Sequence, residues 1–461
     1  MSETIKTQAQ QPDNPMGYGP MLPLIIKMSL PSMFSMLVQA LYNIVDSMFV
    51  ARLNQQALAA VSLVFPVQNL IIGVAVGTGI GVGSLVSRRL GQQDQKSANM
   101  AAAHGLLLGV FNWVVFAIGT FFLIKPFFAQ YRSDPVLYEY ALQYANIVLY
   151  GSVGIFLSVV LEKVLQGTGN MVDPMWIMLI GSLVNLVLDP IMIFGLLGCP
   201  AMGVAGAAIA TVIGQLSGMA YAVVKSVGRR HSHRVTISMK GFTFNWRVIK
   251  DIYQVGLPSM VMQCIGSVMV AGMNAILIAF SQAAVSAFGI YFKLQSFIFL
   301  PVFGLTSGVM PIMGYSYGAH NRQRLMACLR YSIIIASAIM AVGMVVFWLF
   351  PTPLLQIFDA DAELLRIGVP ALRIISLSFL PAAIGIMMST MFQAVGMGIN
   401  SLIMSVLRQL VIILPAAYFL ARLGVNYVWF SLPLAEGFSL VVSLLLYLWV
   451  KKTRLLPLDN Q

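Results

Sequence analysis

Charge is the scarcest property of this sequence. Only 9% of its 461 residues are charged, whereas 59% are hydrophobic, and the mean hydropathy is +0.86. So little polar side-chain surface cannot cover a water-soluble globule of this length, which excludes that class of protein. The sequence therefore predicts an integral membrane protein whose helices lie in the lipid bilayer.

Two further shortages narrow the functional classes. Cysteine is rare, and Cys199, Cys264 and Cys328 are scattered and odd in number, so we expect neither a disulfide framework nor a metal site. The sequence also lacks a glycine-rich phosphate loop that ends in Lys and Ser or Thr, which argues against ATP hydrolysis. We expect no enzymatic activity and no cofactor.

Long apolar stretches, in contrast, recur along the whole chain. Each is near or above the roughly 20 residues that a helix needs to cross a bilayer, and we predict about twelve spans. They include a fourth at Ala141–Gln166, a tenth at Leu364–Val395 and an eleventh at Ser401–Ala421. If both termini lie on one side, that side receives most of the Lys and Arg residues, so the positive-inside rule predicts cytoplasmic termini and an even number of spans. The net charge of +12 then orients the protein, and no nucleic-acid partner is expected.

The chain carries an internal repeat with a spacing of 227 residues. "LPSM" at Leu30 recurs at Leu257, and "QGTG" at Gln166 aligns with "QAVG" at Gln393. We therefore predict an all-α membrane protein with two six-helix bundles related by a pseudo-two-fold axis along the membrane normal, as in secondary transporters built from parallel repeats. The predicted domains are a cytoplasmic tail (1–20), an N-terminal lobe (21–228), a basic cytoplasmic linker (229–247), a C-terminal lobe (248–452) and a second tail (453–461).

Two carboxylates interrupt apolar runs of the first half. Asp46 lies in "YNIVDSMFV" and Asp189 in "NLVLDPIMIFG", although an aspartate at the centre of a lipid-exposed helix costs about 3 kcal/mol on insertion scales. Such residues usually face protein or water and are functional. Their repeat mates are Met273 and Ala416, so the intramembrane acids are concentrated in the first half.

Helical periodicity places polar residues beside each acid. Gln39, Tyr42, Asn43 and Asp46 form one stripe on the first span, at i, i+3, i+4 and i+7. On the fifth span, Asn185 shares a face with Asp189, and Pro190 releases a backbone carbonyl beside them. With a rise of about 1.5 Å per residue, both acids lie roughly 9 Å below the outer surface, and Thr211 on the sixth span lies slightly deeper. The two carboxylates are therefore predicted to share one site.

These blocks resemble a known family. The "LPS" that starts each half, together with "YNIVDSMFVARLNQQALAAVSLVFP", "QGTGNMVDP", "NLVLDPIMIFG" and "GVAGAAIAT", is similar to the multidrug and toxic compound extrusion (MATE) family over nearly the whole chain. An aspartate in the first span, paired with Asn and Asp in the fifth, looks like the DinF-like prokaryotic branch. Acidic cation ligands in the seventh and tenth spans, another pattern of the family, are missing, because the seventh span has Gln263 and Asn274 instead.

The resemblance implies roles for individual residues. Asp46, Asn185, Asp189 and Thr211 would form a cation-binding and coupling site. Pro31 would permit a bend of the first span when that site is protonated, Gln39 would line the drug cavity, and Glu162 falls where another cavity-lining polar residue is expected. We therefore count Gln39, Tyr42, Asn43 and Glu162 as candidate substrate-binding residues, and Pro31 and Pro190 as helix-bending residues.

The predicted function is multidrug efflux by antiport, in which organic, cationic and amphipathic compounds leave in exchange for H⁺ or Na⁺. Oxygen ligands suit Na⁺, whereas two close carboxylates repel and favour a shared proton. The alternative is a flippase for lipid-linked sugars, which would need a basic cavity for pyrophosphate. A non-transporting sensor or channel would need no coupled carboxylates. Glu436 and Arg408 are expected to form an ion pair, and Lys293, the mate of Pro66, has no predicted role.

Overall fold

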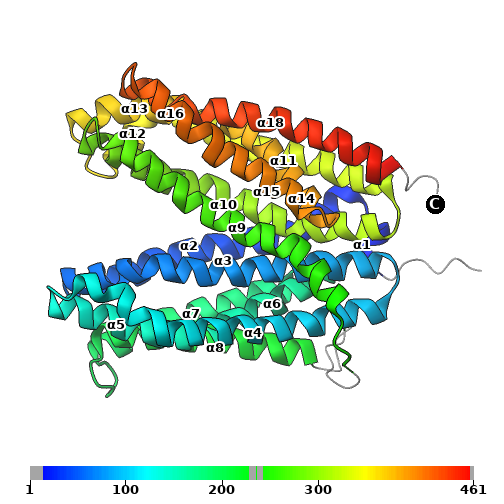
Figure 1. Cartoon of the computed structure of the whole chain (residues 1–461), viewed down its shortest axis with the longest axis horizontal. Coiled ribbons are helices and arrows are strands. Elements are labelled where there is room, and N and C mark those ends of the chain that lie inside the picture. The colour runs from blue at the N-terminus through cyan, green and yellow to red at the C-terminus, as the bar shows by residue number, and fades with distance from the viewer. Residues whose placement is uncertain (1–13, 228–234, 236–241, 457–461) are drawn as a thin grey trace, which may run out of the picture.

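The computed structural model describes residues 14–227, 235 and 242–456, and every regular element in these ranges is a helix (Figure 1). Backbone polar groups in a bilayer have no water to bind, so a helix, which satisfies them internally, is the form such apolar runs adopt. The first half contains α1 (Pro15–Tyr18), α2 (Met21–Ala51), α3 (Gln55–Gly91), α4 (Gln95–Phe128), α5 (Pro135–Tyr150), α6 (Val153–Gly167), α7 (Val172–Phe194) and α8 (Gly203–Val227).

The second half repeats this order. It contains α9 (Trp246–Leu277), α10 (Gln282–Gly318), α11 (Arg322–Leu349), α12 (Pro351–Gln356), α13 (Ala362–Ser376), α14 (Phe379–Ala394), α15 (Gly398–Val406), α16 (Leu414–Ala421), α17 (Val425–Val428) and α18 (Ser431–Val450). Much of the predicted tails and linker, at residues 1–13, 228–234, 236–241 and 457–461, lies outside the described residues.

The predicted number of membrane spans is confirmed within the described part of the chain. Ten helices are long and apolar enough to cross a bilayer, and two bent helix pairs bring the number to twelve. The pairs α5–α6 and α13–α14 bend by 42° and 47°, so the fourth and tenth spans are not the single helices that the sequence predicted. The eleventh span is also irregular, because a π-helical segment, Leu407–Ile413, joins α15 to α16.

Glycines bring the two halves together in pairs that obey the repeat. A Cβ built at Gly304 would come within 2.6 Å of the Met33 Cα, and one built at Gly77 would come within 2.8 Å of the Met260 nitrogen. Gly304 is the repeat mate of Gly77, and Met260 is the repeat mate of Met33. The two contacts are therefore equivalent under the 227-residue repeat. The same reciprocity relates Gly81–Gly256 to Gly308–Ser29 and Gly91–Tyr315 to Gly318–Arg88, while Ser87 meets its own mate, Gly314. The halves are therefore related by a pseudo-two-fold axis that passes near Ser87 and Gly314.

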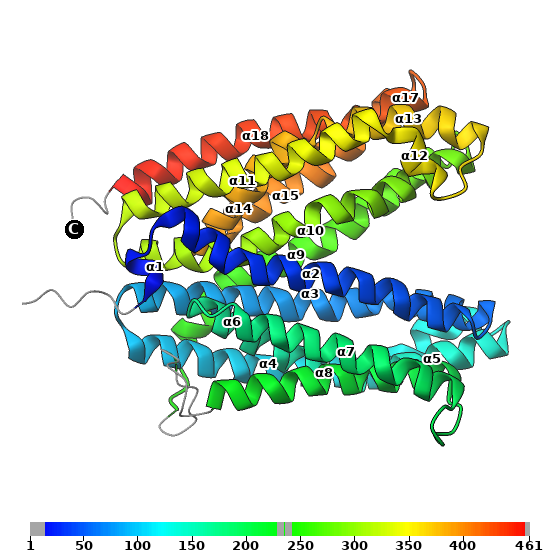
Figure 2. The ribbon, with the colours of Figure 1, turned by 180° about the vertical axis from the view of Figure 1, so that it is seen from behind.

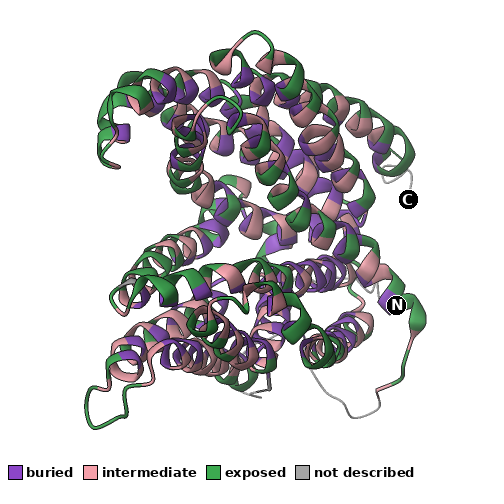
Figure 3. Ribbon diagram, turned by 60° about the vertical axis from the view of Figure 1, so that its left-hand side comes forward, coloured by how far each residue is buried: buried purple, intermediate pink, exposed green. Residues whose placement is uncertain are grey.

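All of these contacts lie toward one end of the molecule. From that end, where the first and last described residues lie, the ribbons of the two halves diverge toward the other end (Figures 1 and 2). The core has the same asymmetry: the main cluster of buried apolar residues fills the second half and crosses into the first at this same end, whereas the opposite end of the first half has a separate cluster. Figure 3 shows the buried residues inside each bundle and at the junction of the halves. We call the joined end the closed end.

The N-terminal segment reinforces the closed end. Met16 is 1% exposed, and Asn14 donates a hydrogen bond from Nδ2 to the Thr168 carbonyl of the first half at 3.3 Å. Arg324 of the second half donates from Nε to the Met16 carbonyl at 2.6 Å and from Nη2 to the Gly19 carbonyl at 2.7 Å. The segment Asn14–Gly19 thus contacts both halves.

Candidate functional site

The two acids of the first half meet between α2 and α7. Asp46 is half-buried on α2, Asp189 is fully buried on α7, and their carboxyl groups contact each other directly. Two ionised carboxylates cannot donate to each other and repel, so the contact is favourable only when a proton or a cation lies between them. The structure thus brings together the two acids that the sequence placed at one depth.

Asn185 and Thr211 complete the cluster. Asn185, one turn before Asp189, donates from Nδ2 to Asp189 Oδ1 and to Thr211 Oγ1, each at 3.3 Å. Thr211 on α8 in turn donates to the Ala207 carbonyl at 2.9 Å, which leaves its oxygen free to accept from Asn185. The four residues predicted for the coupling site therefore lie together, while their role stays a prediction.

The cluster has more acceptors than donors. Asn185 Oδ1 and Asp189 Oδ2 are buried and have no hydrogen-bond donor among the described residues. A buried acceptor without a donor costs about 1–3 kcal/mol, so native proteins rarely leave two in one place. A proton or a hard cation would satisfy both oxygens, and this is the chemistry that the donor set fits.

One residue beside the acids, Tyr144, was missed by the sequence reasoning. Tyr144 on α5 is 4% exposed, interacts with Asp46, and accepts a hydrogen bond from Gln68 Nε2 at 3.4 Å. Its hydroxyl also contacts the Thr211 side chain. The sequence did show a tyrosine in an apolar span, and a buried phenol needs a polar partner. The sequence does not show which residue that partner is.

The polar stripe of α2 continues away from the acids. Tyr42 is half-buried and lies near Asp46, whereas Gln39 and Asn43 are exposed. Exposed amides in a membrane span are expected to face water, so this stripe leads from the acid pair toward solvent-accessible surface.

The two candidate helix-bending prolines both lie inside unbroken helices. Pro31 is part of the continuous α2, and its carbonyl accepts a hydrogen bond from the Ser35 hydroxyl at 2.8 Å. Pro190 directly follows Asp189 within α7. Each proline lacks an N–H and so removes one helix hydrogen bond, which makes it a local weak point whether or not the helix is bent.

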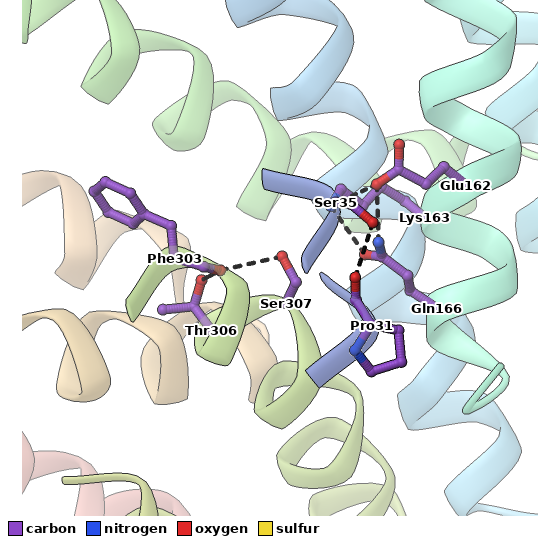
Figure 4. Close-up of polar contacts among 8 residues, drawn as sticks. All are labelled: Pro31, Ser35, Glu162, Lys163, Gln166, Phe303, Thr306 and Ser307. Carbon is purple, nitrogen blue, oxygen red and sulfur yellow. Dashed lines mark hydrogen bonds and ion pairs between the residues drawn. The ribbon is translucent and has the colours of Figure 1, made fainter. Parts of the chain in front are cut away.

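Glu162 lies apart from the coupling cluster, in a network of its own (Figure 4). It accepts a hydrogen bond from Gln166 Nε2 at 2.8 Å and pairs with Lys163 Nζ at 3.4 Å, and Lys163 also donates to Gln166 Oε1 at 2.9 Å. Figure 4 shows these α6 side chains beside Ser35 on α2, which is about three helical turns, or roughly 16 Å, from Asp46. The structure thus pairs the Glu162 charge with Lys163 and does not bring it to the acid pair.

The second half has no acid pair at the equivalent place. Met273 is fully buried and Ala416 is half-buried, so the mates of Asp46 and Asp189 are apolar packing residues. The expected ion pair is confirmed: Arg408 Nη1 lies 3.0 Å from Glu436 Oε1. Arg408 belongs to the π-helical segment, and Glu436 comes from α18. These two charged side chains of the second half therefore compensate each other.

Comparison with known proteins agrees with the duplicated architecture. The family model described as MatE matches residues 31–191 and 258–419, and the two matches begin 227 residues apart, as do the sequence repeats. A protein named FAD transporter from Shewanella oneidensis is 28% identical over 403 residues, covering 86% of this chain and 87% of that protein. The multidrug export protein MepA from Staphylococcus aureus is 26% identical over 433 residues, covering 93% of this chain and 94% of its own length.

Solved structures show the same likeness over nearly the full length. A structure titled as the outward-facing conformation of a multidrug resistance MATE family transporter of the MOP superfamily superposes with a TM-score of 0.87 at 30% sequence identity. The match covers 98% of both chains.

Proposed function

Because this chain belongs to the MatE family of transporters, we propose that it is a multidrug efflux antiporter that exchanges organic compounds for H⁺ or Na⁺ by alternating access. The observation that carries the proposal is the acid pair with its buried, donor-free oxygens in a structure whose halves meet at one end only. A coupled exchanger needs a site whose charge changes and a fold that opens to one side at a time. Transport of this kind involves no enzymatic step and no cofactor.

The orientation is part of the proposal. Of the Lys and Arg residues that the structure describes, most lie at the closed end, so the positive-inside rule assigns that end, and the two termini with it, to the cytoplasm. The structure then represents an outward-facing state of an inner-membrane protein. This orientation agrees with the named state of the similar transporter structure.

We assign proton coupling to Asp46 and Asp189. A proton that enters from outside and lies between the carboxyl groups removes one negative charge and the repulsion between them. A cationic drug bound near Gln39 and Asn43 loses the charge that attracted it, and Pro31 provides the weak point at which α2 can bend. Proton and drug then compete for the same lobe, which is the requirement for antiport.

The test uses efflux and binding together. Inverted membrane vesicles with Na⁺ and pH gradients imposed separately identify the ion that drives export of a fluorescent organic cation. In purified protein, cation binding should weaken as the pH falls, because protonation removes the attracting charge, and Asp189→Asn should flatten that dependence. Ala416→Ser, at the repeat mate of Asp189, is the matched control and should leave it unchanged. If the affinity for the organic cation did not change with pH but fell when Na⁺ was added, the coupling ion would be Na⁺ and not a proton.

A further inference from the structure

Lys293 lies on the face of α10 that turns toward the first half. On this helix, Gly304, Gly308 and Gly318 contact Met33, Ser29 and Arg88 across the pseudo-two-fold axis. Lys293 precedes Gly304 by eleven residues, which is about three turns at 3.6 residues per turn, so both point in nearly the same direction. The lysine therefore continues the line of residues at which the halves meet.

At the level of Lys293 the halves have separated. A rise of about 1.5 Å per residue puts Lys293 roughly 16 Å beyond Gly304, away from the closed end. Its side chain is exposed, and a Cβ built at Gly289, one turn farther along α10, would meet nothing within 4 Å. Counting the same distance along α2 from Met33 reaches the turn that holds Asn43 and Asp46. Lys293 thus lies beyond the glycine contacts, at about the level of this turn of α2, and its ammonium group contacts Phe358 of the second half. The polar stripe at this level lies on the side of α2 that turns away from Met33 and toward the first half.

The charge of Lys293 has no anionic partner in the described part of the chain. The ion pairs found there involve other residues, and its Nζ makes a cation–π contact with Phe358, 5.6 Å from the ring centroid. That contact holds the ammonium against the wall of the second half and leaves its three N–H donors without a carboxylate. The repeat mate is Pro66, so the scaffold itself does not require a base at this position.

We propose that Lys293 binds an anionic group of the transported compound, so that the preferred substrates carry a carboxylate or phosphate in addition to a cationic, apolar body. This inference rests on the proposed efflux function and specifies the substrate class of the same space between the halves. A zwitterion would place its anion on Lys293 and its cation toward the first half, where the acids are. A simple organic cation would gain only the second contact and would be repelled by the lysine.

Rhodamine B and its ethyl ester make a suitable probe pair. The dyes share one cationic ring system, but only rhodamine B has a free carboxylate. Fluorescence anisotropy with the purified full-length protein, corrected for dye in empty detergent micelles, gives both dissociation constants. An exposed charge pair contributes modestly, so the wild-type protein should prefer the zwitterion by about two- to fivefold. Lys293→Gln should abolish the preference, and Lys293→Arg should keep it. Lys96→Gln, which removes an exposed lysine at the closed end, should have no effect.

The outcomes separate the two proposals. Equal affinity of the wild-type protein for both dyes, or a preference that persists in Lys293→Gln, would overturn the role of Lys293 while leaving drug efflux intact. Absence of any ester binding or export by the wild-type protein would instead count against the efflux proposal. Because Lys293 is exposed, Lys293→Gln should fold, and an affinity for the ester at least as high as that of the wild-type protein verifies this directly.

Discussion

Gly304→Ala should shift the protein away from the state with the closed end. The new methyl carbon would lie 2.6 Å from the Met33 Cα and 2.7 Å from its nitrogen, whereas ordinary contacts are 3.4–4 Å. Both neighbours are backbone atoms, so no side-chain rotation can relieve the clash, and α2 and α10 must separate by about 1 Å.

The size of the shift follows from the packing cost. Inserting a methyl group into a tight contact typically costs about 1–3 kcal/mol. A difference of this size changes the ratio of two conformations by about 5- to 150-fold. Alanine also favours a helix over glycine by about 1 kcal/mol, but this gain is the same in both conformations and cancels. The clash, in contrast, exists only while the end is closed.

Electron-resonance distance measurements can detect the change. Spin labels at Lys96 and Gln323, exposed repeat mates at the closed end, report its opening in a background without Cys199, Cys264 and Cys328. We expect a longer distance to gain population in Gly304→Ala. Gly289→Ala is the matched control on the same helix, because a Cβ there meets nothing within 4 Å. Identical distance distributions in the two variants would show that the glycine contacts do not hold this end closed.

Three further predictions concern individual residues. Asp46→Asn should insert and fold but lose gradient-driven efflux, since it removes the coupling charge and keeps the shape; export at the wild-type rate in vesicles would contradict this. Arg408→Met should lower the free energy of unfolding by about 3–5 kcal/mol, because it leaves Glu436, whose side chain is only 13% exposed, unpaired; adding Glu436→Gln should restore part of the thermal stability, and no recovery would show that packing dominates. Arg324→Ala should release the segment around Met16 and speed its limited proteolysis, and unchanged cleavage would show that the hydrogen bonds to its carbonyls do not hold it.

The sequence by itself determined the class of protein, the number of spans and the duplication. These properties depend on local composition and on a fixed repeat spacing, and both can be read along the chain. The position of Asp46 and Asp189 at one depth was also predictable, because a helix has a constant rise per residue. The pairing of Arg408 with Glu436 followed from the cost of leaving either charge alone in a membrane.

Only the tertiary structure decided which surfaces meet. The bends after Tyr150 and Ser376 leave no clear mark in an apolar run, because hydrophobic periodicity does not record how neighbouring helices deflect each other. Tyr144 reaches the acid pair from a different helix, and Glu162 pairs with its neighbour Lys163 away from that pair, as side-chain packing dictates. The direction in which Lys293 points could not be predicted from the sequence, because only the glycine contacts show which face of α10 turns toward the first half. Such contacts join residues far apart in the chain, so no local pattern contains them.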